Sequence, residues 1–306
     1  MPGEQIGFIG VGSMGRPVAK RLLASGFPLD FYSSRQGTVN ELESAGAQSL
    51  PTPLTVADRA DVLMTCLPED SDLFEVYLGP DGVLEHLRKD SLVIDLSSTS
   101  PMMMQRVADE ARARSINVVD APVSGGTYGA EHGTLTITVG ASQESFERAK
   151  PFLDVLGKKV VHVGDVGMGK IFKTVNNILT GTTMVLVGEA LALAANAGAD
   201  LEKLYETIGA SSGNSNVWQD IVPKLIHGDP DEPVGFRLEL MRKDIGLAGS
   251  LGEDLDTPLP MTTLAKQFYV GACARGLGGR HAHEIARVAA RTAGADIRVE
   301  ELERSI

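Results

Sequence analysis

The chain is poor in cysteine. Its 306 residues include two cysteines, Cys66 and Cys273, which lie far apart in the sequence, each among apolar neighbours. Two such residues cannot build a disulfide framework or a thiolate metal site, and this usage is typical of a reducing compartment. We therefore expect a cytoplasmic protein.

Positive charge is also scarce. Lysine and arginine total 28 against 40 aspartates and glutamates, which gives a net charge of −12. A basic surface is needed to follow a nucleic-acid backbone or an anionic lipid surface. The N-terminus carries no charged leader, and no uninterrupted apolar run reaches membrane-spanning length. We expect no nucleic-acid partner, no membrane partner and no targeting signal.

A metal-ligating cluster is missing as well. His281 and His283 have no companion carboxylate at ligand spacing. On a helix, two residues separated by one position would face apart. We expect no metal.

Short β-branched or apolar runs alternate with amphipathic stretches through the first 164 residues, as in the βαβ units of a parallel sheet. The expected strands are Ile6–Gly10, Leu29–Tyr32, Val62–Cys66, Leu92–Asp95, Asn117–Asp120, Thr134–Gly140 and Val160–Val163. The expected helices between them are Arg16–Ser25, Thr38–Ala45, Ser71–Leu78 and Pro101–Arg114.

Strand patterns nearly vanish after Gly164, and long Ala- and Leu-rich helices follow, beginning with one predicted over Met168–Ala197. The pattern predicts an α/β protein with a Rossmann-type doubly wound sheet in residues 1–164 and an all-α substrate and dimerisation domain in residues 165–306. The helical half could hardly bury its apolar surface alone, which favours a homodimer or homotetramer.

A glycine fingerprint follows the first strand. The G-x-G-x-x-G spacing stands between a predicted strand and a predicted helix, which is the context of dinucleotide binding. The first glycine allows a tight turn, the second lets the backbone approach a pyrophosphate, and the third permits close helix packing. The residues are Gly10, Val11, Gly12, Ser13, Met14 and Gly15.

The end of the second strand indicates which cofactor is preferred. An acidic residue here would bind the ribose hydroxyls of NAD, whereas a cation accommodates the 2′-phosphate of NADP. The chain has Ser33, Ser34 and Arg35 at this place, and Asp30 lies within the strand itself. We expect NADP(H) to be favoured, with NAD(H) as the alternative.

Other loops follow the carboxyl ends of strands, where open α/β sheets bind ligands. Leu67-Pro68 and the hydroxyls of Ser97-Ser98-Thr99 are candidates for the nicotinamide half of the cofactor, whereas Ser100 is better explained as a helix cap. In a third loop, Ser124, Gly125 and Gly126 could present a hydroxyl and backbone N–H groups to a carboxylate.

Lys173, Asn176 and Asn177 introduce polar groups into an otherwise apolar helical segment. Side chains four residues apart share a helix face, so Lys173 and Asn177 can address one small ligand.

These segments resemble the four signature segments of the β-hydroxyacid dehydrogenase family, the 3-hydroxyisobutyrate dehydrogenase type, which is similar in fold to 6-phosphogluconate dehydrogenase. The resemblance rests on GFIGVGSMG at 7–15, DAPVSGG at 120–126, GDVGMGKIFKTVNN at 164–177 and GFRLELMRKDIGLA at 235–248.

The resemblance implies roles for single residues. Lys173 matches the catalytic lysine, Asn177 a substrate-binding amide, and Lys243 with Asp244 the segment that closes the site beside the nicotinamide. Ser124, Gly125 and Gly126 match the loop that holds the substrate carboxylate. Trp218 and Phe236 lie near segments that line the substrate pocket in relatives.

Together these features predict an oxidoreductase that transfers hydride between NAD(P) and a small β-hydroxy acid or its semialdehyde, with a lysine as general acid and base. An imine reductase is a second candidate, but such enzymes usually replace the lysine. A dinucleotide sensor without turnover is a third candidate, which the intact Lys173–Asn177 pair disfavours.

Overall fold

The computed structural model describes residues 3–228 and 235–297. The chain forms two compact units, Met1–Thr174 and Val175–Ile306, called the sheet unit and the helical unit below. The strands are β1 (Ile6–Ile9), β2 (Leu29–Tyr32), β3 (Gln48–Ser49), β4 (Val62–Thr65), β5 (Leu92–Asp95), β6 (Asn117–Asp120), β7 (Val123–Ser124), β8 (Leu135–Gly140) and β9 (Gly157–Gly164).

The sheet-unit helices are α1 (Gly15–Ala24), α2 (Gln36–Ser44), α3 (Pro53–Arg59), α4 (Asp70–Leu78), α5 (Pro101–Ala113), α6 (Gly126–His132) and α7 (Gln143–Asp154). Helix α8 (Met168–Asn196) passes from one unit into the other. The remaining helices are α9 (Leu201–Gly209), α10 (Asn216–His227), α11 (Leu238–Asp254), α12 (Pro260–Ala274) and α13 (Glu284–Thr292).

Every strand and helix that we placed from the sequence is present, with ends shifted by three residues at most. Three sheet-unit helices were missed. Two of them begin at ordinary caps that we overlooked: the hydroxyl of Thr52 caps α3, and that of Ser142 caps α7. The third, α6, starts at Gly126, the second glycine of the Ser124 loop, which we expected to remain a loop.

The sheet is a Rossmann sheet. Its order is β3-β2-β1-β4-β5-β6-β8-β7, with β9 on β8, and its first six strands are parallel. The order reverses at β1, so the ends of β1 and β4 border the crevice where such sheets take ligands.

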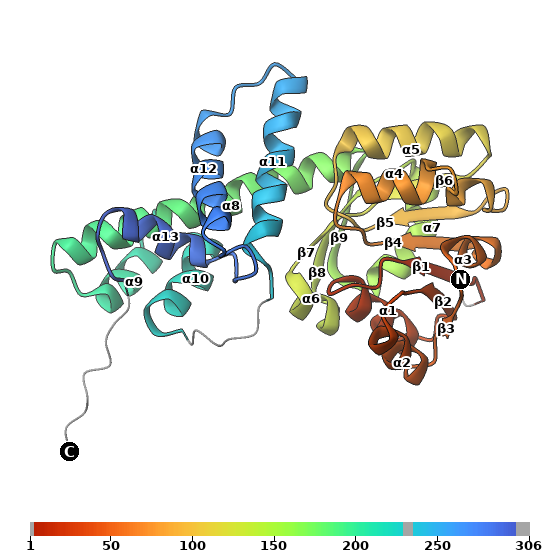
Figure 1. The fold of residues 1–306 in the computed structure, drawn as a ribbon, viewed down its shortest axis with the longest axis horizontal. Coiled ribbons are helices and arrows are strands. Elements are labelled where there is room, and N and C mark those ends of the chain that lie inside the picture. The colour runs from red at the N-terminus through yellow and green to blue at the C-terminus, as the bar shows by residue number, and fades with distance from the viewer. Residues whose placement is uncertain (1–2, 229–234, 298–306) are drawn as a thin grey trace. The chain divides into compact units, whose positions relative to one another are not determined.

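Helices cover both faces of the sheet (Figure 1). Alternate residues of the central strands enter cores on these opposite faces. Phe8, Met64 and Ile94 lie in the core under α1 and α7, while Leu63 and Val93 lie in the core under α3, α4 and α5. Both faces are therefore covered, and the carboxyl ends of the strands are left to form a site.

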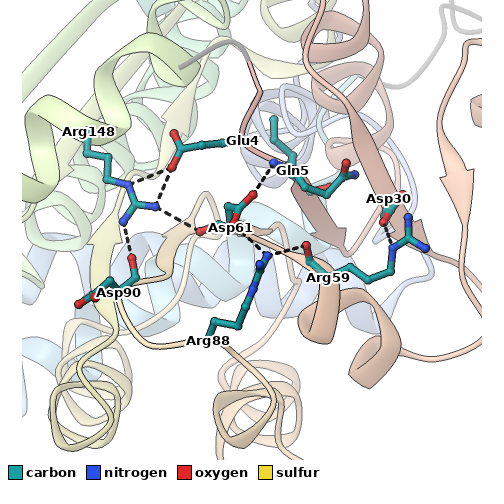
Figure 2. A network of polar contacts seen from close by, with 9 residues as sticks. Glu4, Gln5, Asp30, Arg59, Asp61, Arg88, Asp90 and Arg148 are labelled. Atoms are coloured by element: carbon teal, nitrogen blue, oxygen red, sulfur yellow. Dashed lines mark hydrogen bonds and ion pairs between the residues drawn. The ribbon is translucent and has the colours of Figure 1, made fainter.

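Ion pairs and hydrogen bonds connect the amino ends of the strands (Figure 2). Arg148 of α7 donates to Glu4 at 2.7 Å and to the carbonyl of Asp90 at 2.5 Å, while Arg88 donates to Asp61 at 2.9 Å. Each acceptor lies just before a strand, so this network closes the edge opposite the carboxyl ends.

The helical unit has its own core, built from α8 to α13. Among the described residues, α8 is the one helix long and apolar enough to span a membrane by length and composition, with a mean hydropathy of 1.7. We had not expected a stretch of that length. Burial explains part of this apolar composition, since Val187 and Leu191 lie inside the core of the helical unit.

Candidate active site

The glycine turn after β1 separates structural from functional glycines. Gly10 has φ +94°, and a Cβ there would lie 2.9 Å from the carbonyl carbon of Cys66. A Cβ on Gly15 would overlap the carbonyl oxygen of Gly10. A Cβ on Gly12, by contrast, meets nothing within 4 Å. The fold requires glycine at positions 10 and 15. At position 12 the absence of a side chain instead leaves a space in which a ligand can approach the protein backbone.

Helix α1 points an uncapped N-terminus at this space. Met14, its N-cap residue, makes no side-chain cap, and no acidic residue lies in its first turn. Val11 is buried, whereas Gly12 and Ser13 are exposed. Uncapped N–H groups and the helix dipole bind anions, so the turn fits the pyrophosphate of a dinucleotide.

The end of β2 presents Ser33, Ser34 and Arg35 at the surface, with the Ser33 Oγ accepting the Arg35 N–H at 3.2 Å. Asp30 is buried within the strand, and Arg59 of α3 donates to its carboxylate at 2.7 Å (Figure 2). This carboxylate is engaged by Arg59, so the groups presented at the β2 end are two hydroxyls and a guanidinium.

The loops after β4 and β5 are joined to each other. The backbone N–H of Leu67 donates to Ser97 Oγ at 2.8 Å. Pro68 is exposed and Ser98 half-buried beside them. Ser100 caps α5 by accepting the Met103 N–H at 3.1 Å, which confirms its expected role as a helix cap.

The predicted catalytic lysine and one predicted substrate-binding residue meet in the sheet unit. Lys173 Nζ donates to Ser124 Oγ at 3.0 Å. The next two residues, Gly125 and Gly126, have φ of +132° and +63°, conformations that favour glycine. A hydrogen bond therefore joins the predicted proton carrier to the predicted carboxylate loop, although 49 positions separate the two residues in the sequence.

The other predicted polar residues meet in the helical unit. Asn177 Nδ2 donates to Asp244 Oδ2 at 2.7 Å, and Asn177 Oδ1 accepts from Asn176 at 3.1 Å. Lys243 Nζ lies 3.0 Å from Asp244 Oδ1. These contacts fix which end of the amide is the donor, and one Asn177 N–H is left for another acceptor.

The two aromatic candidates belong to the helical unit. Trp218 is buried in its core, and its Nε1 donates to the carbonyl of Tyr205 at 3.3 Å. Phe236 is half-buried against the same core.

The histidine pair differs from our expectation. His281 and His283 precede α13 rather than lying on a helix, and their rings stack with centroids 4.1 Å apart. The expected divergence of the two rings was wrong because that argument assumed helical geometry. Among residues 3–228 and 235–297, no group of three potential metal ligands occurs.

Sequence reasoning missed a buried polar cluster at the ends of β4 and β5. The Lys170 ammonium contacts the Asp95 carboxylate and donates to the Ser97 carbonyl at 2.5 Å. Asp95 Oδ1 also accepts from Thr65 at 2.5 Å and from Ser97 at 2.6 Å. All four residues are buried. A lysine one helical turn before Lys173 in an apolar segment was the available signal.

Asp120 was missed as well. It ends β6, and its two oxygens accept the N–H groups of Gly167 at 2.6 Å and Lys170 at 2.8 Å, so it caps α8. Burial raises the pKa of Asp120 to about 6, against the lowering effect of the Lys170 charge and the two N–H groups. A Cβ on Gly169 would lie 2.6 Å from Asp120 Oδ2, so glycine permits this close approach.

Family comparisons cover both units. Residues 5–164 match the family described as the NAD binding domain of 6-phosphogluconate dehydrogenase. Residues 167–289 match the NAD-binding family of NADP-dependent 3-hydroxyisobutyrate dehydrogenase.

Individual relatives agree with these families. A 2-(hydroxymethyl)glutarate dehydrogenase from Eubacterium barkeri is 41% identical, with 93% of this chain and 94% of that protein aligned. The mitochondrial 3-hydroxyisobutyrate dehydrogenase of Mus musculus is 37% identical over 89% of this chain and 82% of its own length.

A solved structure shares the fold along nearly the whole chain. The 3-hydroxyisobutyrate dehydrogenase of Mycobacterium tuberculosis, determined with L-serine, superposes with a TM-score of 0.85 at 26% identity, covering 93% of this chain and 98% of that one. The chain therefore belongs to the β-hydroxyacid dehydrogenases, NAD(P)-dependent oxidoreductases that act on the CH–OH group of small hydroxy acids.

Proposed function

We propose that Lys173 carries the proton in hydride transfer between NAD(P) and a small β-hydroxy acid. The observation that supports this most directly is the 3.0 Å hydrogen bond from Lys173 Nζ to Ser124 Oγ. This bond places the Lys173 amine beside the Ser124 hydroxyl, which is followed by two glycines whose backbone N–H groups suit a carboxylate. One acid could therefore contact both the amine and this loop.

The nicotinamide, when bound, accepts or supplies the hydride. We assign its dinucleotide to the residues at the carboxyl ends of β1, β2, β4 and β5, and we assign Lys243 to the nicotinamide side of the site. The residues are Gly10, Val11, Gly12, Ser13, Met14, Gly15, Ser33, Ser34, Arg35, Leu67, Pro68 and Ser98.

Lys173 works in either direction. In reduction its ammonium polarises the carbonyl and donates a proton to the oxygen; in oxidation the neutral amine takes the proton from the hydroxyl. Ser124, Gly125 and Gly126 hold the carboxylate, and the remaining Asn177 N–H donates to the substrate. Fixing the acid in this way supplies orientation, which can remove much of the barrier. Trp218 and Phe236 remain proposed substrate contacts.

The substrate class follows from what the relatives share. The names of the three proteins above mention 2-(hydroxymethyl)glutarate, 3-hydroxyisobutyrate and L-serine. Each of these compounds carries a hydroxymethyl group on the carbon next to a carboxylate. We propose that this chain acts on the same unit, a primary alcohol β to a carboxylate, or on the matching semialdehyde.

Variants at Lys173 test the mechanism. Lys173→Met should lower kcat on the order of 10³-fold, within the range of general acid–base catalysis, while NADPH binding measured by fluorescence is unchanged. Lys173→Arg keeps the positive charge, but a guanidinium does not lose its proton and so cannot act as a base. Oxidation of the hydroxy acid should therefore fail in this variant too. Lys158→Met, at an exposed lysine, is the control. Undiminished turnover in Lys173→Met would remove this residue from the mechanism.

We infer a preference for NADP(H) over NAD(H). The inference rests on the exposed Arg35 at the end of β2 and on the engagement of Asp30 by Arg59. A guanidinium pairs with the 2′-phosphate, which NAD lacks.

We propose that the protein is a homodimer or a homotetramer joined through α8. Leu179, Leu186 and Leu193 recur every seven residues and are 65%, 58% and 75% exposed. Beside them lies an apolar groove of about 410 Å³, also lined by Leu204 and Trp218. A stripe on one helix can pack against its own copy across a two-fold axis.

We keep the cytoplasm as the proposed location because the chain has two cysteines that lie far apart in the sequence, a usage typical of a reducing compartment. The net charge of −12 supports the absence of nucleic-acid and membrane partners.

A further inference from the structure

Lys170 is the most buried lysine described in the sheet unit, and its side chain has no exposed surface. It comes from the first turn of α8, one turn before Lys173. Its ammonium contacts the carboxylate of Asp95 and donates to the carbonyl of Ser97 at 2.5 Å.

Lys170 is held from two neighbouring strands. Asp95 and Asp120 are paired in register at the ends of β5 and β6. Asp95 takes the Lys170 side chain, while Asp120 accepts the Lys170 backbone N–H at 2.8 Å. The start of α8 is therefore fixed to the sheet through both the main chain and the side chain of one residue.

The same cluster extends into two loops. Ser97 Oγ donates to Asp95 at 2.6 Å and accepts the Leu67 N–H at 2.8 Å. On the other side Thr65, at the end of β4, donates to Asp95 at 2.5 Å and shares a hydrogen bond with Tyr77 of α4 at 2.9 Å. The loops after β4 and β5 are thus linked through Asp95 to Lys170.

Stability alone does not account for this arrangement. Taking both charges out of water offsets much of their attraction, and apolar residues of similar volume often replace a buried ion pair without loss. What an apolar pair could not do is bond to the Ser97 carbonyl and Ser97 hydroxyl together.

We propose that Lys170 is a positioning residue: through Asp95 and Ser97 it fixes the two cofactor loops to the turn of α8 that carries Lys173. This rests on the proposed function, since it takes Leu67 and Ser98 as cofactor contacts and Lys173 as the proton carrier. Lys170 itself touches neither substrate nor cofactor.

The test compares Lys170→Met with a matched control. Arg148→Met also removes a cation that joins neighbouring strands, through Glu4 and the carbonyl of Asp90, but at the amino ends of the strands, opposite the cofactor loops. Both variants should lose stability in urea unfolding. Lys170→Met alone should raise the dissociation constant of NADPH and lower kcat, each at least tenfold, with the KM for the acid changed less than threefold.

A neutral pair provides the rescue. In Lys170→Gln with Asp95→Asn, the two amides can bond to each other and Gln can still donate to the Ser97 carbonyl. Cofactor affinity and kcat should return to within threefold of the wild type. If Lys170→Met does not fold, Ser97→Ala tests the proposal instead. This variant removes the hydroxyl that accepts the Leu67 N–H and should weaken NADPH binding about fivefold.

The proposal is overturned if Lys170→Met binds NADPH within twofold of the wild type, if Arg148→Met shows equal losses, or if Ser97→Ala binds normally. NADPH binding is measured without an acid. A wild type that binds NADPH but turns over none of the acids contradicts the proposed function and leaves this test intact.

Discussion

The two units of this protein differ in where their buried charged groups and their exposed apolar side chains are concentrated. The sheet unit buries charged groups, among them Lys170, Asp95 and Asp120, and gives each of them partners. The helical unit leaves large apolar groups such as Leu186 and Leu193 exposed along α8. The difference teaches that the sheet unit gathers buried polar groups at the carboxyl ends of its strands, whereas the helical unit presents an apolar stripe, which we propose is covered by a second copy.

The largest effect is expected for a substitution in the exposed leucine stripe of α8. Leu186→Lys places a charge in the α8 stripe of both copies, and losing two buried leucines costs about 3–6 kcal/mol. The dimer dissociation constant should therefore rise more than 100-fold in sedimentation velocity. Leu255→Lys, equally exposed but off the stripe, should change nothing. A wild type that sediments as a monomer would contradict the comparison.

The next effect tests the buried acid of the sheet unit. Burial raises the pKa of Asp120 from 3.8 to about 6. The folded state therefore holds this proton more tightly than the unfolded state, and the stability that Asp120 contributes is fully present below pH 3.8 and lost as pH rises through about 6. The loss amounts to roughly 3 kcal/mol. Urea unfolding at several pH values should show it in the wild type and not in Asp120→Asn. Parallel curves for the two proteins would refute it.

His283 should give the opposite slope in the helical unit. Burial, with smaller contributions from His281 and two nearby cations, lowers the pKa of His283 from 6.5 to about 3. The unfolded state then binds the proton more tightly, so this contribution is present above pH 6.5 and declines as pH falls toward 3. Between pH 7 and pH 5 the loss is roughly 2 kcal/mol. Hydrogen exchange should locate it in α13 and not in α1, and His283→Gln should abolish it; a slope that survives in this variant would count against it.

The smallest effect concerns the glycine turn. A Cβ on Gly12 meets nothing within 4 Å, so Gly12→Ala should leave the unfolding free energy unchanged while weakening NADPH binding about tenfold, roughly 1.4 kcal/mol. Calorimetry and fluorescence titration measure the two quantities. Gly249→Ala, equally unobstructed but in the helical unit, is the control. Normal NADPH affinity in Gly12→Ala would mean that the space beside this glycine is not the pyrophosphate site.

Local sequence determined much of this protein. Short continuous apolar runs predict strands that are buried on both faces, and glycine at position 15 is required by the carbonyl oxygen of Gly10, five residues earlier. The order of strands and helices, the cap at Ser100 and the family resemblance could all be predicted because each depends on short spacings. The helices α3 and α7 had such signals too, at Thr52 and Ser142.

Tertiary structure alone decided which distant groups meet. Lys170 and Asp95 are 75 positions apart, and only the β5–α8 packing shows that the lysine is an internal partner rather than a surface charge. The stacked histidines were misjudged for the same reason, since their ring directions depend on a segment without helical periodicity. Spacing fixes neighbours within a helix or strand, but contacts between elements depend on how the whole chain packs.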